Sequence, residues 1–134
     1  MTIINDIRQA LDAKLAAASG LPALVFQNVS YEQVPATPHI RVQFIPTSRR
    51  PANRGPNPQH RHQGLYILTV CTEMDKGAGA TLDYVDTLLA LFNGSTDAVG
   101  ASVNVSIDYS EMQESYMDDP FYCAPVQVSW YAYA

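Results

Sequence analysis

The sequence predicts a single α+β domain with an antiparallel or mixed sheet of about five strands and two helices packed on one face. The chain has 134 residues, the usual size of one domain with one hydrophobic core, so residues 1 to 134 are expected to fold as one unit. Two segments repeat apolar residues at helical spacing, and others alternate apolar with polar residues or are continuously apolar, as strands are. Helix and strand segments do not alternate strictly, which disfavours a parallel doubly wound sheet.

The two helices are predicted from apolar residues that recur on one face of each segment. The first spans residues 3 to 18, with apolar positions Ile4, Ile7, Leu11 and Leu15. Gly20 and Pro22 then supply its stop signal. The second spans residues 82 to 92, with apolar positions Leu82, Val85, Leu88, Leu89 and Phe92, and it stops at Asn93 and Gly94.

The strands are predicted at residues 24 to 29, 39 to 44, 65 to 72, 103 to 107 and 126 to 131. The segment 65 to 72 is apolar on both faces, which predicts a strand that is covered on both sides. Helices of the same chain can cover one side, and the other side then needs a layer of its own or a neighbouring subunit. Residues 109 to 119 are expected to form an extended or hairpin connection with an acidic rim.

Residues 46 to 62 predict a long mobile loop. They contain four prolines together with Gly55, Asn53 and Asn57, a composition that pairs poorly in a sheet and buries little apolar surface. Loops of this length in ordered domains usually bind something or are disordered.

This predicted loop also concentrates positive charge. Arg49, Arg50, Arg54 and Arg61 lie within it, and it holds no acidic residue. The other four basic residues are set against all 13 acidic residues of the chain, whose net charge is −5. A basic loop on an acidic body steers association with an anionic molecule or with an acidic face of a neighbour. We therefore predict that the four arginines bind a partner.

Aromatic residues gather near the end of the sequence. Alternation places Trp130 on one face of the last strand and Tyr131 and Tyr133 on the other. Tyrosine is favoured at interfaces because it is apolar along its ring and polar at its tip, although ordinary packing also accounts for such residues. Tyr131 and Tyr133 are added to the predicted partner-binding set.

The two cysteines, Cys71 and Cys123, lie in apolar segments that are predicted to be strands. The composition excludes a membrane-spanning chain, and the first residues lack a secretion signal. We therefore expect synthesis in the cytoplasm, where both residues stay buried, inert thiols.

The sequence offers little for catalysis or for cofactor binding. Residues 76 to 79 resemble a phosphate-binding turn only superficially, because a dinucleotide fingerprint needs a glycine where this chain has Leu82. His60 and His62 form an H-x-H pair, but no third ligand follows at a recognised spacing and arginines surround the pair. The G-x-S-x-G motif is absent. We expect no enzyme, and no catalytic, metal or cofactor-binding residues.

Several segments in succession resemble the tail terminator proteins of long-tailed bacteriophages. They are residues 25 to 31, the proline-bounded strand at 38 to 46, residues 64 to 70, and Gly77 to Gly79 leading into the second helix. The resemblance covers residues 1 to 95, and the later strands fit by pattern only. It implies a small α+β subunit that forms a six-membered ring on the head-proximal end of the tail tube. Such a ring stops polymerisation of the tube and presents a surface to the head connector.

The resemblance implies further copies of the chain, the tail tube protein and the head connector as partners, with DNA passing through the ring. It places the protein in the virion tail and implies no cofactor and no membrane. Another neck or tail-completion protein, or a tube subunit, has a similar size and symmetry. A small hydrolase or ligand-binding domain is an alternative of a different class, which a concave pocket with converging polar groups would favour.

Overall fold

A computed structural model describes residues 3–26, 38–56, 59–73, 79–94, 97–100, 103–118 and 121–134. Within these ranges the elements in chain order are α1 (Ile3–Ala16), β1 (Ala23–Val25), β2 (His39–Pro51), β3 (His60–Glu73), α2 (Gly79–Leu91), β4 (Asp97–Val99), β5 (Asn104–Met112), β6 (Tyr116–Asp118) and β7 (Phe121–Tyr133). Residues 27 to 29 of the first predicted strand and residues 74 to 78, which hold most of the glycine turn, lie outside the described part.

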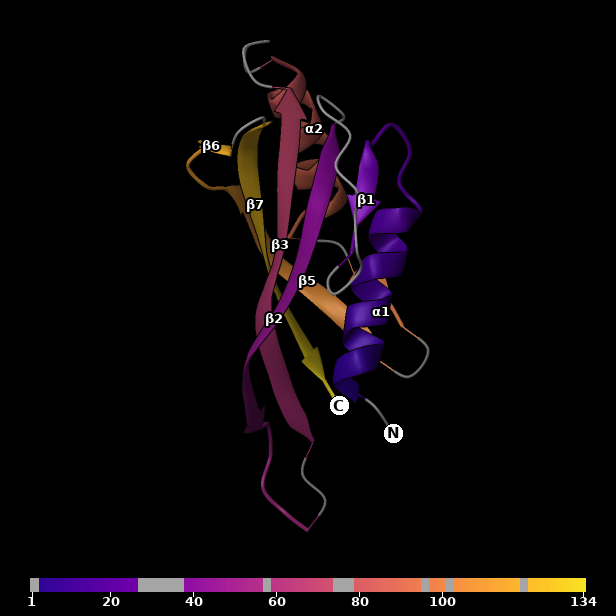
Figure 1. The fold of residues 1–134 in the computed structure, drawn as a ribbon. Helices are drawn as coiled ribbons and strands as arrows, with labels where there is room; N and C mark the ends of the chain where they lie inside the picture. Colours follow the sequence, from indigo (N-terminus) through magenta and orange to yellow (C-terminus); the bar gives the residue numbers. More distant parts are fainter. Residues whose placement is uncertain are drawn as a thin grey trace.

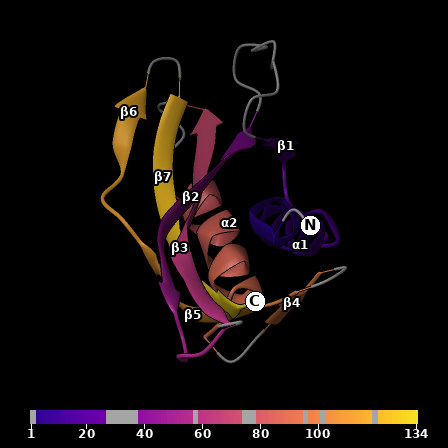
Figure 2. The ribbon, with the colours of Figure 1, turned by 90° about the horizontal axis from the view of Figure 1, so that it is seen from below.

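The described strands form one mixed sheet in the order β1-β2-β3-β7-β5-β4, and β6 pairs with β7. The β1–β2 pair is parallel and the other pairs are antiparallel. β7 is the central strand, because it pairs with β3 along its whole length on one side and with β5 and β6 on the other. The sheet is curled into a half-barrel (Figures 1 and 2).

Both helices lie on the concave side of this sheet (Figure 2). α2 packs against β3, β7 and β5, whereas α1 contacts β4 and β5 at the open side of the curl. The hydroxyl of the fully buried Tyr66 on β3 donates a hydrogen bond to the carboxylate of Asp12, which ties α1 to the centre of the sheet. The two predicted helices are confirmed, but α1 closes the mouth of a half-barrel and does not lie beside α2 on a flat face.

No described helix covers the convex side of the sheet (Figures 1 and 2), although Cys71, Cys123 and Phe121 form a small buried cluster at one end of it. On β3, Tyr66, Leu68 and Val70 point to the concave side and are fully buried. Leu65 and Ile67 alternate with them on the convex side and are half-buried. β3 is therefore apolar on both faces, as predicted. Helices cover its concave face, and no described helix covers its convex face.

The predicted count of about five strands was too low, since the described residues contain seven strands. β4 and β6 have three residues each, which is too short for an alternation pattern to be recognised. The stretch 109 to 119, expected to be a connection, holds the end of β5 and all of β6. Because β6 pairs with the start of β7, it continues the line of β5 along the same side of the central strand.

The prediction of a long loop at residues 46 to 62 was wrong. β2 continues to Pro51 and β3 begins at His60, and the two pair down to the register Pro51 with His60. Prolines are compatible with this arrangement because β1 pairs with β2 only at residues 39 to 41, so the rest of β2 is an edge strand. A bulge between Pro46 and Ser48 shifts the register once. We call residues 46–56 and 59–63 the hairpin.

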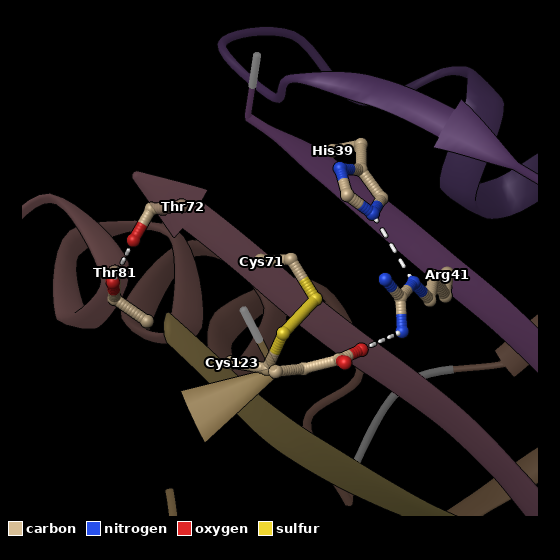
Figure 3. Close-up of a disulfide and its surroundings, with 7 residues drawn as sticks. His39, Arg41, Cys71, Thr72, Thr81 and Cys123 are labelled. Atoms are coloured by element: carbon tan, nitrogen blue, oxygen red, sulfur yellow. Dashed lines mark hydrogen bonds and ion pairs between the residues drawn. A yellow bond between two sulfur atoms is a disulfide. The ribbon is translucent and has the colours of Figure 1, made fainter. Parts of the chain in front are cut away.

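The prediction of free thiols was also wrong, because Cys71 and Cys123 form a disulfide (Figure 3). The two residues lie directly opposite each other on β3 and β7, with 4.2 Å between their Cα atoms. Both point to the convex side and are fully buried there beside Phe121. The bridge joins positions 52 residues apart, and closing a loop of that size in the unfolded chain stabilises the fold by about 4 kcal/mol.

The base of the hairpin is fixed by Trp130, which is 1% exposed. Its ring stacks on Phe44, with 5.3 Å between the ring centroids and 9° between the planes. Gly64 leaves the room for this ring, because a Cβ added there would lie 2.7 Å from Trp130 Cζ2 and 2.3 Å from the carbonyl oxygen of Ile45. A side chain at position 64 therefore collides with the core and with the neighbouring strand.

We predict that Gly64→Ala lowers the free energy of unfolding by about 1 to 3 kcal/mol, the cost of overpacking a core. Urea unfolding followed by the fluorescence of Trp130, the one tryptophan in the sequence, measures the change. Gly79→Ala is the matched control, because nothing lies within 4 Å of a Cβ added at position 79. Equal stability of the two variants would contradict this account of the hairpin base.

Candidate interaction surface

Backbone hydrogen bonds hold the hairpin to the end of β7. The backbone N–H of His60 donates to the carbonyl of Ala134 at 2.9 Å, and that of Ala134 donates to the carbonyl of His60 at 2.9 Å. At the tip, the N–H of Ala52 donates to the carbonyl of Gln59 at 2.6 Å, and the N–H of Gln59 donates to Oδ1 of Asn53 at 2.8 Å. The arginines of the hairpin are thus carried on paired strands and on a hydrogen-bonded turn.

Four of the six predicted partner-binding residues lie together on the convex side. Arg50 pairs with Arg61, and Arg61 pairs in turn with Tyr133. The guanidinium carbon of Arg61 lies 5.0 Å from the ring centroid of Tyr131, within range of a cation–π interaction. The rings of Tyr131 and Tyr133 meet edge to face at 6.1 Å. Arg50, Arg61, Tyr131 and Tyr133 therefore form a row across β2, β3 and β7.

The other two predicted residues lie apart from this row. Arg49 pairs with His62, so its side chain points to the opposite side of the hairpin, where Nη2 lies 3.4 Å from Nδ1 of His60. Arg54 is exposed in the turn. The hairpin therefore presents positive charge on both of its sides and at its tip. That these six residues bind a partner stays a prediction.

The charge on the hairpin is not compensated within the described part of the chain. The ion pairs found there are Arg8 with Asp12 and Arg41 with Asp118, and neither involves the hairpin. Arg50 and Arg61 are like charges placed directly opposite each other, an arrangement that destabilises a strand pair. An anionic group bound at this position would relieve that repulsion.

A shallow cavity of about 410 Å³ borders the row of arginine and tyrosine side chains. Arg61 and Tyr131 form part of its wall, and Thr47 and Asp108 contribute from the two strands that carry register shifts. No three histidine, cysteine, aspartate or glutamate side chains of the described residues gather as a metal site requires. No described helix has the length and apolar character needed to cross a membrane.

A second cluster, which the sequence analysis missed, surrounds the disulfide on the convex side (Figure 3). Arg41 Nε donates to Nε2 of the buried His39 at 3.2 Å, and Arg41 Nη1 lies 2.8 Å from Oδ2 of Asp118. His39 packs edge to face on Phe121 at 4.7 Å. The Arg41–Asp118 ion pair joins β2 to β6 across the two strands that the disulfide links. Only the long-range register brings these residues together, so sequence spacing gave no signal for the cluster.

The comparisons with known proteins identify the family. The family model described as phage tail terminator protein matches residues 6–130. The chain belongs to the phage tail terminator family. A solved structure known only by a sequence identifier has the same fold, with a TM-score of 0.72 at 17% sequence identity over 97% of this chain and 94% of that one. No curated protein sequence matches the chain.

Membership in the tail terminator family gives the hairpin a context. Terminators are structural proteins of the phage tail, so this chain is a structural component of the virion tail. A structural protein of this kind acts by contacting other tail components. The uncompensated charge of the hairpin and the open convex side are then surfaces available for such contacts.

His62 makes the hairpin base sensitive to pH. It is 4% exposed, and its Nε2 has no hydrogen-bond partner among the residues that the structure describes. Burial, followed by the positive charges of Arg49 and His60, lowers the pKa of His62 below its ordinary value of 6.5. Between this lowered pKa and the ordinary value of 6.5, the unfolded chain therefore binds a proton at His62 that the folded chain does not. The stability contributed by neutral His62 is complete above about pH 6.5 and is lost as the pH falls toward the pKa of the folded state.

We predict that the free energy of unfolding falls more steeply from about pH 7.5 to about pH 5 in the wild-type protein than in His62→Gln. Urea unfolding at several pH values measures both slopes. His60→Gln is the control and should keep most of the steep slope, because it removes only the smallest of the three causes and leaves the buried His62 in place. Parallel slopes for wild type and His62→Gln, or a pKa of His62 at or above 6.5 by NMR titration, would refute the assignment.

Proposed function

We propose that this protein is the tail terminator itself: a ring on the head-proximal end of the tail tube that stops polymerisation and provides the surface on which the head connector joins. The observation that carries this proposal is the match of the terminator family model to residues 6–130. The proposed partners are further copies of this chain in a ring of six, the tail tube protein and the head connector. DNA passes through the lumen.

Two features of the structure support the proposal. The hairpin extends the sheet past the ends of the other strands (Figure 1) and carries four arginines that no described carboxylate neutralises. The half-buried Leu65 and Ile67 lie on a side that no described helix covers. Both features suit a subunit inside an assembly, because neighbouring subunits can supply negative charge against the arginines and can cover the apolar residues of the convex side.

A protein surface is the better target for the hairpin arginines than the DNA in the lumen. Non-specific binding to DNA depends on the phosphate charge and is favoured by a basic protein, whereas this chain has a net charge of −5. Positive charge confined to one projecting segment instead fits an acidic patch of limited size on a neighbour. DNA binding by the hairpin would show itself as sequence-independent affinity that falls steeply with salt.

Electron microscopy of particles assembled without this protein tests the proposal most directly. We expect tails of uncontrolled length that remain separate from heads, because tube growth then lacks its stop and the connector lacks its platform. A wild-type copy of the gene supplied in trans should restore tails of uniform length that are joined to heads. Tails of normal length that join heads normally in its absence would refute the proposal.

We predict that changing Arg49, Arg50, Arg54 and Arg61 together to glutamine preserves the fold but lowers the yield of joined particles. Substitutions of the exposed Arg49, Arg50 and Arg54 change stability by only about 0.5 kcal/mol each. The partly buried Arg61 loses its contact with Tyr131 but also its repulsion with Arg50, and charge at a contact governs encounter rate and register. Thermal unfolding checks the first expectation, and counts of tails attached to heads check the second.

The control for this variant removes two positive charges outside the hairpin, by Arg8→Gln together with Lys14→Gln on α1. It should join heads normally once its folding is verified. Normal yields of joined, infectious particles from the quadruple arginine variant would show that the hairpin is only a solvated extension of the sheet.

A further inference from the structure

The end of the sheet opposite the hairpin is acidic. In the strand register, Glu73 of β3 and Asp118 of β6 both pair with Phe121, the first residue of β7. Glu114 is exposed just before β6, and Glu111 is exposed on β5 opposite Gln127, at the middle of β7, so Glu111 is the acidic residue of this group nearest the hairpin. Among the described residues of these strand ends, only Arg41 is basic, and it forms an ion pair with Asp118. We call Glu73, Glu111, Glu114 and Asp118 the acidic end.

The acidic end and the hairpin are separated by the length of the central strand. β7 pairs with Arg61 at Tyr133 and with Glu73 at Phe121. Twelve steps of about 3.3 Å place these two ends about 40 Å apart along the strand. This is several Debye lengths at physiological salt, so the two charged regions of one molecule barely interact with each other. Figure 1 shows the hairpin at one extreme of the sheet and β6 near the other.

The acidic end also presents apolar surface and an open strand edge. Met117 is 67% exposed and Tyr116 is 44% exposed on β6. β6 pairs only with β7 among the described strands, so its other edge leaves backbone groups unpaired. An exposed edge of this kind invites a neighbouring chain to dock. At the other end of the sheet, Tyr131 and Tyr133 flank Arg61. Each end thus combines charge with aromatic or apolar area.

We propose that the hairpin of one copy of this chain docks on the acidic end of the next copy, head to tail. The occupant is a second copy because the two surfaces have opposite charge, lie on opposite halves of the sheet and, Asp118 excepted, form no ion pair with any described residue. A contact between two different surfaces of identical subunits is heterologous, and it closes into a ring when the rotation allows. The inference rests on the ring of the proposed function and specifies which surfaces hold it together.

Charge reversal at each end tests this pairing. The hairpin variant carries Arg49→Glu, Arg50→Glu and Arg54→Glu, and the acidic-end variant carries Glu73→Lys, Glu111→Lys and Glu114→Lys. Asp118 is left intact so that its ion pair with Arg41 survives. Circular dichroism and thermal unfolding verify that both variants fold. Sedimentation velocity at low salt, with protein up to about millimolar concentration, then measures assembly.

We expect the wild-type chain to associate into a closed species larger than a dimer, more weakly as salt is added. Each reversed variant alone should associate at least about tenfold more weakly, because both partners at every contact then have like charge. An equimolar mixture of the two variants should assemble, since each supplies the surface that the other needs. A chain that carries all six substitutions should also assemble, because its two ends are again complementary.

A control variant with Asp86→Lys changes an exposed carboxylate on α2, which belongs to neither end of the sheet, and should assemble as the wild type does. Full assembly of either reversed variant alone would overturn the proposed pairing while leaving a terminator ring held by other surfaces. A wild-type chain that stays monomeric under these conditions, forms only a two-fold dimer, or shows no rescue in the mixture also overturns it. Normal tails in particles that lack the protein would instead refute the proposed function.

Discussion

The stack of Trp130 on Phe44 is the contact on which the placement of the hairpin depends. Trp130 belongs to the central strand, and Phe44 lies on β2 just before the bulge from which the hairpin begins. Their rings fit together only because Gly64, between them on β3, has no side chain. The contact fixes three adjacent strands at one point, and beyond it β3 stays paired with β2 on one side and with the end of β7 on the other. The hairpin therefore extends from a rigid base.

Local patterns predicted the parts of the fold that local patterns determine. Both helices and the strands at residues 39 to 44 and 126 to 131 repeat their apolar residues with the correct period, and the structure forms them there. The alternation also placed Trp130 and Tyr133 on opposite faces of the last strand, as observed, and the structure shows that the face of Trp130 is the core. β4 and β6 were not predicted, because three residues are too few to show an alternation of apolar and polar side chains. They are strands only because they pair with β5 and β7.

The two outright errors came from properties that depend on distant parts of the chain. Pro46 and Pro51 indicated a loop because proline interrupts a central strand, yet β2 is an edge strand along this stretch and tolerates them. Cys71 and Cys123 were expected to remain thiols, and the β3–β7 register places them directly opposite each other. Neither the edge position of β2 nor that register can be obtained from spacing along the sequence. Of the candidate site, the sequence supplied the charged and aromatic residues, and the register supplied the row in which Arg50, Arg61, Tyr131 and Tyr133 meet.

The strands that join the two charged ends are continuous, and this has a consequence for the proposed ring. β3 and β7 pair without a register shift from Arg61 to Glu73, and the disulfide and the Arg41–Asp118 ion pair fasten the acidic end of that ladder. The hairpin and the acidic end are therefore joined by continuous paired strands, without a hinge in that ladder. In a head-to-tail assembly the rotation between neighbours sets the number of subunits at closure. In the proposed ring that rotation would follow from the twist and curl of the sheet, because both contact surfaces lie on one continuous ladder of strands.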